Sequence, residues 1–169
     1  MPALKEAMFY EKLEKGRVKC RLCAHGCAIM PGKRGICAVR ENRDGTLYSL
    51  VYGKVIAANI DPIEKKPLFH FMPGSLSYSI ATVGCNFRCG HCQNYEISQF
   101  PRERPDVPIP GSNMAPQEVV EAALKGRCKS ISYTYTEPTV FLEFAYDCAR
   151  LAREKGIRNV FVSNGFMTP

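Results

Sequence analysis

From residue 75 onward, the sequence alternates between patterns typical of β-strands and patterns typical of helices. Short apolar stretches predict strands over 75–83, 131–135 and 159–163. Between them, apolar residues recur at helical spacing over 116–125 and 138–156, each with a proline at its start. Strands separated by helices predict an α/β fold with a parallel sheet of βα units, whose functional loops lie at the carboxyl ends of the strands.

The predicted sheet is short. A (β/α) barrel of about 250 residues spends roughly 31 residues on each of its eight βα units, so residues 76–169 provide about three units. We therefore expect a partial (β/α) barrel, truncated after about three units, and interpret the chain as a fragment of a longer protein. A naturally short chain that completes its sheet by association is the alternative.

The residues before this alternation predict a separate module. A Cys-rich segment is followed by a loosely alternating stretch, 45–60, which predicts a β-hairpin after the turn signal Arg43-Asp44-Gly45. Prolines and a glycine then mark a connector that ends near Gly74. We expect an N-terminal module over 1–74 and the beginning of the α/β core domain over 75–169.

Composition narrows the class of protein. The chain has 169 residues, 46% of them hydrophobic, which is enough for one ordinary domain. No apolar run approaches the roughly 18 residues of a membrane span, and residues 1–16 mix charges unlike a signal peptide, so we expect a cytoplasmic protein without a membrane partner. Disulfides seldom persist in that compartment, so nine cysteines indicate metal or redox chemistry.

The net charge of +7 is concentrated in the first third of the chain. A basic segment is compatible with an acidic partner or nucleic acid. Few aromatic residues are interleaved among these charges, however, which favours a solvated basic face. Nucleic acid is therefore not an expected partner.

Three cysteines follow the first predicted strand, in the order Cys85-x3-Cys89-x2-Cys92. Thiolates select soft metals, with zinc and iron–sulfur clusters as the leading candidates. A structural zinc site takes four ligands, whereas a four-iron cluster held by three cysteines keeps one iron open for a substrate or cofactor. The alternatives are a zinc site completed by His91 and buried apolar cysteines that are neighbours by chance.

A second set of four cysteines lies near the N-terminus: Cys20, Cys23, Cys27 and Cys37. Four ligands would close a zinc site or hold a second iron–sulfur cluster without an open iron. Reduced structural cysteines are the alternative. His25 is a candidate ligand too, but a surface or hydrogen-bonding role is favoured for it. Cys128 and Cys148, in a turn and on an apolar helical face, are expected in the core.

The three-cysteine motif after a strand resembles the signature of radical SAM enzymes. In that superfamily the three cysteines hold a 4Fe-4S cluster, and S-adenosylmethionine chelates the fourth iron. The segment TYTEPT, 134–139, resembles the family's Gly-Gly-Glu-Pro segment, which implies that Thr136 and Glu137 lie beside the methionine amino group. Residues 163–165, Ser-Asn-Gly, resemble a Thr-Asn-Gly near the cofactor, which implies cofactor-binding roles for Ser163 and Asn164.

His91 takes the position of an aromatic side chain that packs near the adenine in this family. Three positions depart from the family pattern: Tyr135 and Thr136 replace the two glycines, and Val162 replaces an acid found in glycyl-radical activases. Read from the residues alone, Glu137 would favour a helix N-terminus and residues 163–165 would form a strand-ending turn.

The segments CRLCAHGC, GKRGICAVR, FHFMPGS and GCNFRCGHCQN together resemble AmmeMemoRadiSam-type radical SAM proteins, relatives of the pyruvate formate-lyase activating enzymes. The resemblance implies reductive cleavage of S-adenosylmethionine to a 5'-deoxyadenosyl radical, which abstracts hydrogen from a protein or small-molecule substrate. It also implies a reductant such as ferredoxin or flavodoxin. The alternatives are a glycyl-radical enzyme activase and a non-catalytic zinc-binding module that contacts nucleic acid or protein.

Overall fold

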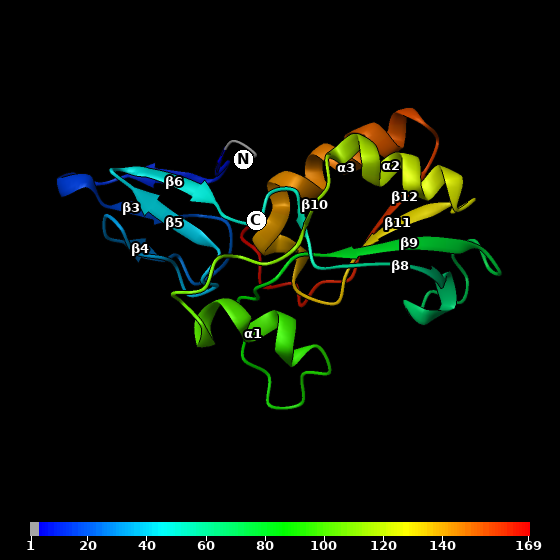
Figure 1. Ribbon diagram of the computed structural model, residues 1–169, viewed down its shortest axis with the longest axis horizontal. Helices are drawn as coiled ribbons and strands as arrows, with labels where there is room; N and C mark the ends of the chain where they lie inside the picture. Colours follow the sequence, from blue (N-terminus) through cyan, green and yellow to red (C-terminus); the bar gives the residue numbers. More distant parts are fainter. Residues whose placement is uncertain (1–3) are drawn as a thin grey trace.

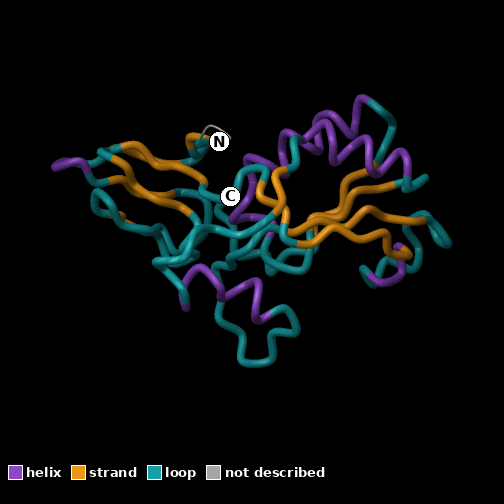
Figure 2. The backbone as a smooth tube through the Cα atoms, viewed as in Figure 1, coloured by secondary structure: helices purple, strands orange, loops and turns teal. Residues whose placement is uncertain are grey.

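A computed structural model describes residues 4–169, which form a mixed α/β structure (Figure 1). The first three residues of the predicted N-terminal module lie outside the described part. Short strands make up one side of the molecule, and a larger sheet covered by two helices makes up the other (Figure 2). The cysteine loop, defined as residues 85–92, and helix α1 (Tyr95–Glu103) lie below the junction between them.

The larger sheet has the strand order β12-β11-β9-β8. Its parallel strands are β9 (Leu76–Ala81), β11 (Ser130–Tyr133) and β12 (Arg158–Phe161). These strands confirm the three sequence predictions, with boundaries shifted by one or two residues. In register, Ser130 lies opposite both Ser77 and Arg158, so the carboxyl ends of the three strands meet at one edge.

Two helices cover one face of this sheet (Figure 1). Helix α2 (Pro116–Lys125) matches its prediction, whereas the segment predicted over 138–156 divides into the 3-10 turn η3 (Pro138–Phe141) and helix α3 (Leu142–Glu154). Cys128 and Cys148 are buried in the hydrophobic core here, as expected. Within residues 4–169, no helix is long and apolar enough to cross a bilayer.

Side chains of the central strands alternate between two environments, as the twofold repeat of a strand requires. Tyr78, Ile80, Ile131 and Tyr133 belong to the hydrophobic core beneath the helices. The intervening residues on the opposite face are four buried serines, Ser77, Ser79, Ser130 and Ser132. This second face is therefore polar, in contrast to the apolar face that packs against α2 and α3.

Asp61 anchors the polar side chains at the outer strand of the sheet, β8 (Ala57–Pro62). Its carboxylate accepts hydrogen bonds from Lys65 Nζ at 2.8 Å, Lys66 Nζ at 2.7 Å and Tyr135 Oη at 2.5 Å. Burial acts to raise the pKa of Asp61, but these donors outweigh it and hold that pKa well below its ordinary value. Asp61 is therefore a buried carboxylate that stays ionised.

The N-terminal part contains two small antiparallel sheets, of order β1-β6-β5 and β2-β3-β4. The first consists of β1 (Lys5–Glu6), β5 (Arg40–Arg43) and β6 (Thr46–Ser49), and the second of β2 (Tyr10–Lys12), β3 (Val18–Cys20) and β4 (Ala28–Ile29). The remaining elements are η1 (Glu14–Gly16), η2 (Ile63–Lys65), β7 (Lys54–Val55) and β10 (Ser112–Asn113). β7 and β10 pair with each other, which ties residue 112 back to the first third of the chain.

The prediction of a hairpin within 45–60 is wrong, because the strands in this stretch pair with other strands. The turn at Asp44 and Gly45 instead joins β5 to β6, and the second half of the stretch forms β8. β8 pairs with β9 over six residues, whereas β6 has only four residues with which it could pair. The larger sheet therefore includes a strand from the N-terminal side of the expected boundary at Gly74.

The Pro-rich stretch 100–111 has the composition of a loop, yet α1 extends into it as far as Glu103. Pro101 has no N–H, so it cannot bond to the carbonyl of Ile97 four residues earlier. That carbonyl accepts instead from the backbone N–H of Gly84, at 3.0 Å. A bond from the end of β9 thus replaces the missing helical bond, and the proline is tolerated inside the helix.

Candidate metal and cofactor site

The candidate site lies where the parallel strands end. β9 leads through Gly84 into the cysteine loop, β11 leads to Thr136 and Glu137, and β12 leads to residues 163–165. This arrangement follows from the parallel register, because the carboxyl ends of parallel strands share one edge of the sheet. The structure thus brings the three segments singled out in the sequence to the same edge.

The cysteine loop displays its thiols to different degrees: Cys85 and Cys92 are partly buried, and Cys89 is exposed. The backbone N–H of Phe87 lies 3.4 Å from Cys85 Sγ, and the Ser98 hydroxyl lies 3.5 Å from Cys92 Sγ. Burial raises the pKa of Cys85, although the Phe87 N–H and nearby Arg102 act to lower it. Metal binding at Cys85 therefore has to release a proton.

Three cysteine thiols on one loop are a donor set of the kind that holds an iron–sulfur cluster. Across residues 4–169, no three His, Cys, Asp or Glu side chains lie close enough together to hold one metal ion. A 4Fe-4S cluster fills the space between its ligands, so its cysteines need not meet at a point. The loop also has room, because a Cβ added at Gly90 meets no described atom within 4 Å.

Gly84 sets the direction in which the cysteine loop leaves β9. Its φ is +97°, and an added Cβ would lie 2.6 Å from Val39 Cγ1 and 3.2 Å from the carbonyl oxygen of Cys37. Both the backbone conformation and the close approach exclude a side chain. The N-terminal part of the molecule therefore presses directly against the start of the cysteine loop.

Glu137 is a buried hub between the ends of β11 and β12, only 3% exposed. Its Oε1 accepts from the Thr139 backbone N–H at 3.0 Å and from the Ser163 hydroxyl at 2.8 Å. Its Oε2 accepts from the Asn164 backbone N–H at 2.8 Å. Glu137 therefore caps the start of η3, as its preference for a helix N-terminus suggested, and also fixes the turn after β12.

Asn164 connects this turn to the cysteine loop. Its side-chain Nδ2 donates to Asn86 Oδ1 at 2.8 Å, and Asn86 is the residue next to Cys85. Thr136 donates from its hydroxyl to the carbonyl of Thr82, just after β9, at 2.8 Å. His91 is exposed. The chain Glu137–Asn164–Asn86 thus joins all three strand ends by hydrogen bonds.

Arg102 on α1 is a residue that sequence reasoning missed. Its guanidinium donates to the backbone carbonyls of Cys85 at 2.6 Å, Phe87 at 2.9 Å and Ile36 at 2.7 Å. It therefore holds the cysteine loop to both α1 and the N-terminal part. The Pro-rich composition around Arg102 is typical of a loop, and no local pattern indicates this role.

The N-terminal cysteine segment touches the cysteine loop directly. His25 Nε2 donates to the backbone carbonyl of Asn86 at 2.9 Å, in agreement with the expected hydrogen-bonding role of His25. Its ring also packs edge-on against Phe87 and Phe166, with centroid distances of 6.3 and 4.9 Å. The two cysteine sets are thus adjacent parts of one region.

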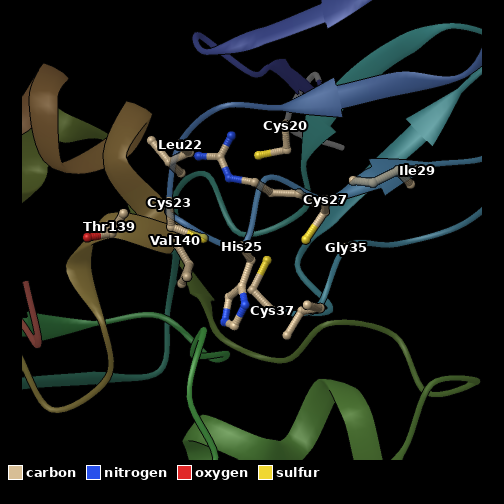
Figure 3. Close-up of a pocket in the computed structure, with 12 residues that line it drawn as sticks. Cys20, Leu22, Cys23, His25, Cys27, Ile29, Gly35, Cys37, Thr139 and Val140 are labelled. Atoms are coloured by element: carbon tan, nitrogen blue, oxygen red, sulfur yellow. The ribbon is translucent and has the colours of Figure 1, made fainter. Parts of the chain in front are cut away.

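The four N-terminal cysteines line a single small cavity of about 20 Å³ (Figure 3). Cys20 and Cys37 are buried, and Cys23 and Cys27 are partly exposed. Burial raises the pKa of Cys20, and it raises the pKa of Cys37 to about 11. The structure thus brings together all four members of this set.

The sequence is similar to one protein family and to two uncharacterized proteins. Residues 79–169 match the family model described as the Radical SAM superfamily. An uncharacterized protein of Methanocaldococcus jannaschii, MJ0808, is 55% identical over 97% of this chain, and the match covers 48% of that relative. A second uncharacterized protein of that organism, MJ0674, is 30% identical over 73% of the chain and is covered over 32% of its length. No solved structure matches.

Proposed function

The chain belongs to the radical SAM superfamily, and from this premise we propose that it is a radical SAM enzyme, or the cofactor-binding part of one. The reaction would be the one-electron reductive cleavage of S-adenosylmethionine to methionine and a 5'-deoxyadenosyl radical, which takes a hydrogen atom from a substrate. The observation that carries the proposal is the set of three thiols on one open loop at the carboxyl end of β9.

Cys85, Cys89 and Cys92 would hold a 4Fe-4S cluster with one iron left for the cofactor. When bound, this cluster would supply the electron that breaks the carbon–sulfur bond of the sulfonium. The protein would supply binding, orientation and exclusion of water. Arg102 and Asn86 would keep the loop in place. Arg102, on α1, donates to the backbone carbonyl of Cys85, and Asn86, within the loop, accepts from the side chain of Asn164.

Glu137 would receive the methionine amino group. A carboxylate oxygen has two lone-pair sites, and within the described chain Oε2 accepts a single hydrogen bond, from Asn164. That leaves Oε2 able to accept an ammonium N–H as well. Ser163 and Asn164 would orient this carboxylate, Thr136 would line the same edge, and the exposed ring of His91 would pack near the adenine.

We also propose that the larger sheet is part of a (β/α) barrel. Two of the three parallel strands, β9 and β11, carry buried serines on the face opposite the helices, and the chain spans about half the length of its relative MJ0808. The remaining half of such a protein would supply further strands beyond β12. The branch, AmmeMemoRadiSam-type, and a reductant such as ferredoxin or flavodoxin remain proposals from the sequence resemblance.

Electron paramagnetic resonance of anaerobically reconstituted, dithionite-reduced protein tests this function. We expect a reduced four-iron signal that changes when S-adenosylmethionine is added, and we expect Cys85→Ala to remove that change. Cys128→Ala, at a buried thiol of the core, is the matched control and should leave the signal intact. A four-iron signal indifferent to the cofactor, or zinc in place of iron, would reject the proposal.

A further inference from the structure

The N-terminal thiol pocket, which we define as the cavity lined by Cys20, Cys23, Cys27, Cys37 and Arg40, has the features of a second metal site. Its thiols come from separate segments: one ends β3, one precedes β4, and the others lie in the intervening and following turns. The backbone N–H of Cys20 donates to the carbonyl of Cys27 at 2.9 Å, and that of Gly26 to the carbonyl of Cys23 at 3.0 Å. These tight turns direct all four thiols to one enclosed space (Figure 3).

Arg40 is a buried residue of this pocket with unused hydrogen-bond donors. The side chain is 1% exposed, and its Nη2 donates to Glu143 Oε2 at 2.6 Å. Its Nε and Nη1 are buried and have no hydrogen-bond partner anywhere in the described chain. Leaving a buried donor unsatisfied costs about 1–3 kcal/mol, and more for a charged group. Arg40 lines the cavity, and two of its guanidinium nitrogens lack an acceptor, so an acceptor bound in the pocket would satisfy them.

Arg40 needs a hydrogen-bond acceptor in the pocket and not a counter-ion. Its positive charge is already balanced by the carboxylate of Glu143, at 2.6 Å. A divalent metal ion with four thiolates carries two negative charges, and so does an oxidised four-iron cluster with four thiolates. Either group would place anionic sulfur beside Arg40, which lines the cavity.

We propose that Cys20, Cys23, Cys27 and Cys37 bind a closed metal centre through four thiolates, with Arg40 as its buried hydrogen-bond donor. Thiolates select zinc or iron–sulfur clusters, and four of them leave no open position. Each thiol releases its proton as its sulfur binds, so binding one zinc ion releases four protons and involves no electron transfer. The sulfurs do not yet converge on one point, so a single ion would draw them inward.

This centre would fasten the candidate site to the N-terminal part. Thr139 and Val140 of η3 line the same cavity, only two and three residues beyond Glu137. His25, between two of the cysteines, contacts the backbone of the cysteine loop through Asn86. The centre is thus placed to fix both the loop and the start of η3. The inference does not rest on the proposed radical chemistry, because it concerns different cysteines.

The test uses the full chain with Cys85, Cys89 and Cys92 all changed to alanine, so that any bound metal belongs to the second set. Anaerobic titration with Co²⁺, a spectroscopic probe for zinc sites, should give the absorption of a tetrahedral thiolate site at one equivalent. In parallel, reconstitution with iron and sulfide shows whether the pocket prefers a cluster. One equivalent of either centre supports the proposal. Failure to retain either metal would overturn it.

Two variants on this background assign the ligands. Cys27→Ser should abolish metal binding, while Cys128→Ser, at a buried cysteine outside the pocket, should leave it unchanged. Metal retained undiminished by Cys27→Ser would reject the assignment. A further measurement needs no pocket variant, so a misfolded variant cannot affect it. Adding a chelator to the metal-loaded triple variant should lower its melting temperature. An unchanged melting temperature would also count against the centre.

Arg40→Lys tests the hydrogen-bond donor, because lysine keeps the positive charge but lacks the planar fork of N–H groups. Loss of a partner that supports metal ligands typically weakens metal binding by about 10–100-fold, and we expect a loss in that range. Circular dichroism checks that the variant is folded. Unchanged metal affinity in folded Arg40→Lys would show that Arg40 does not support the centre.

Discussion

The two cysteine sets differ in enclosure as well as in number. The four N-terminal thiols line a small cavity and include the buried Cys20 and Cys37, whereas the cysteine loop offers three thiols, with Cys89 exposed. A metal centre held by four thiolates has no free coordination position for a substrate. A cluster held by three thiolates keeps one iron open. Ligand count and access would therefore separate the two proposed metal sites into a structural and a reactive role.

The two sets are also held in place differently. The N-terminal thiol pocket depends on a buried ion pair between Arg40 and Glu143, at 2.6 Å. The cysteine loop depends on hydrogen bonds to its backbone from Arg102 and to its side chains from Asn164. Removing either support should affect one set first, which makes the comparison testable.

The largest effect is expected from the ligands themselves. Cys89→Ala should remove the signal that responds to S-adenosylmethionine completely while leaving the metal of the N-terminal set in place. Cys23→Ala should do the reverse. Metal analysis and electron paramagnetic resonance of the two variants would check this, and the contrast between the sets fails if either variant empties both.

Breaking the buried ion pair should have the next largest effect. Glu143→Ala leaves Arg40 as an uncompensated buried charge and also removes the acceptor of the Met8 backbone N–H, at 2.9 Å. Breaking such a pair costs about 3–5 kcal/mol, to be measured as the free energy of unfolding in urea under anaerobic conditions. The control is Glu11→Ala in the exposed pair with Arg21, where no measurable change is expected.

A smaller effect is expected in the cysteine loop. Arg102→Met removes charged hydrogen bonds to the carbonyls of Cys85 and Phe87, and we expect unfolding to become easier by about 2 kcal/mol. Iron should also be lost faster from the reconstituted protein, which timed metal analysis would detect. Arg104→Met, two residues further on and exposed, is the matched control. Equal iron loss from both variants would contradict a specific role for Arg102.

The smallest effect is expected at Asp61, which lies outside both cysteine sets and serves as a reference. The pKa of Asp61 is held below its ordinary value, so its ionised form stabilises the folded state above the unfolded pKa of about 4. This contribution is lost as the pH falls through the lower, folded pKa. Between pH 7 and 3, Asp61→Asn should therefore lose less stability than the unaltered protein, as thermal unfolding would show. Parallel pH curves would contradict this account.

Local periodicity explains which elements could be predicted from the sequence. The strands and the helix over 116–125 show regular apolar spacing, and the cysteines identify themselves by type and interval. α1 was missed because Pro101 usually ends a helix, and the Gly84 N–H that compensates for it lies far back in the chain. Arg102 was missed for the same reason, since its role depends on that helix.

Pairings across long sequence separations were also beyond the sequence pattern. β8 alternates like one strand of a local hairpin, yet its partner is β9, across the connector. Glu143 sits within a helical apolar pattern, and nothing local shows that Arg40 faces it. The parallel strand ends were the exception, because their meeting at one edge follows from topology alone.

The ion pair between Arg40 and Glu143 also bears on the order of events during synthesis. Its two residues are 103 positions apart, and a ribosome adding ~5–20 residues per second needs about 5–20 s to cover that distance. For that time the N-terminal thiols exist on a nascent chain without the residues of η3 and α3 that enclose them. Metal binding would then compete with folding. Metal that arrives after folding would have to enter a pocket that is already covered.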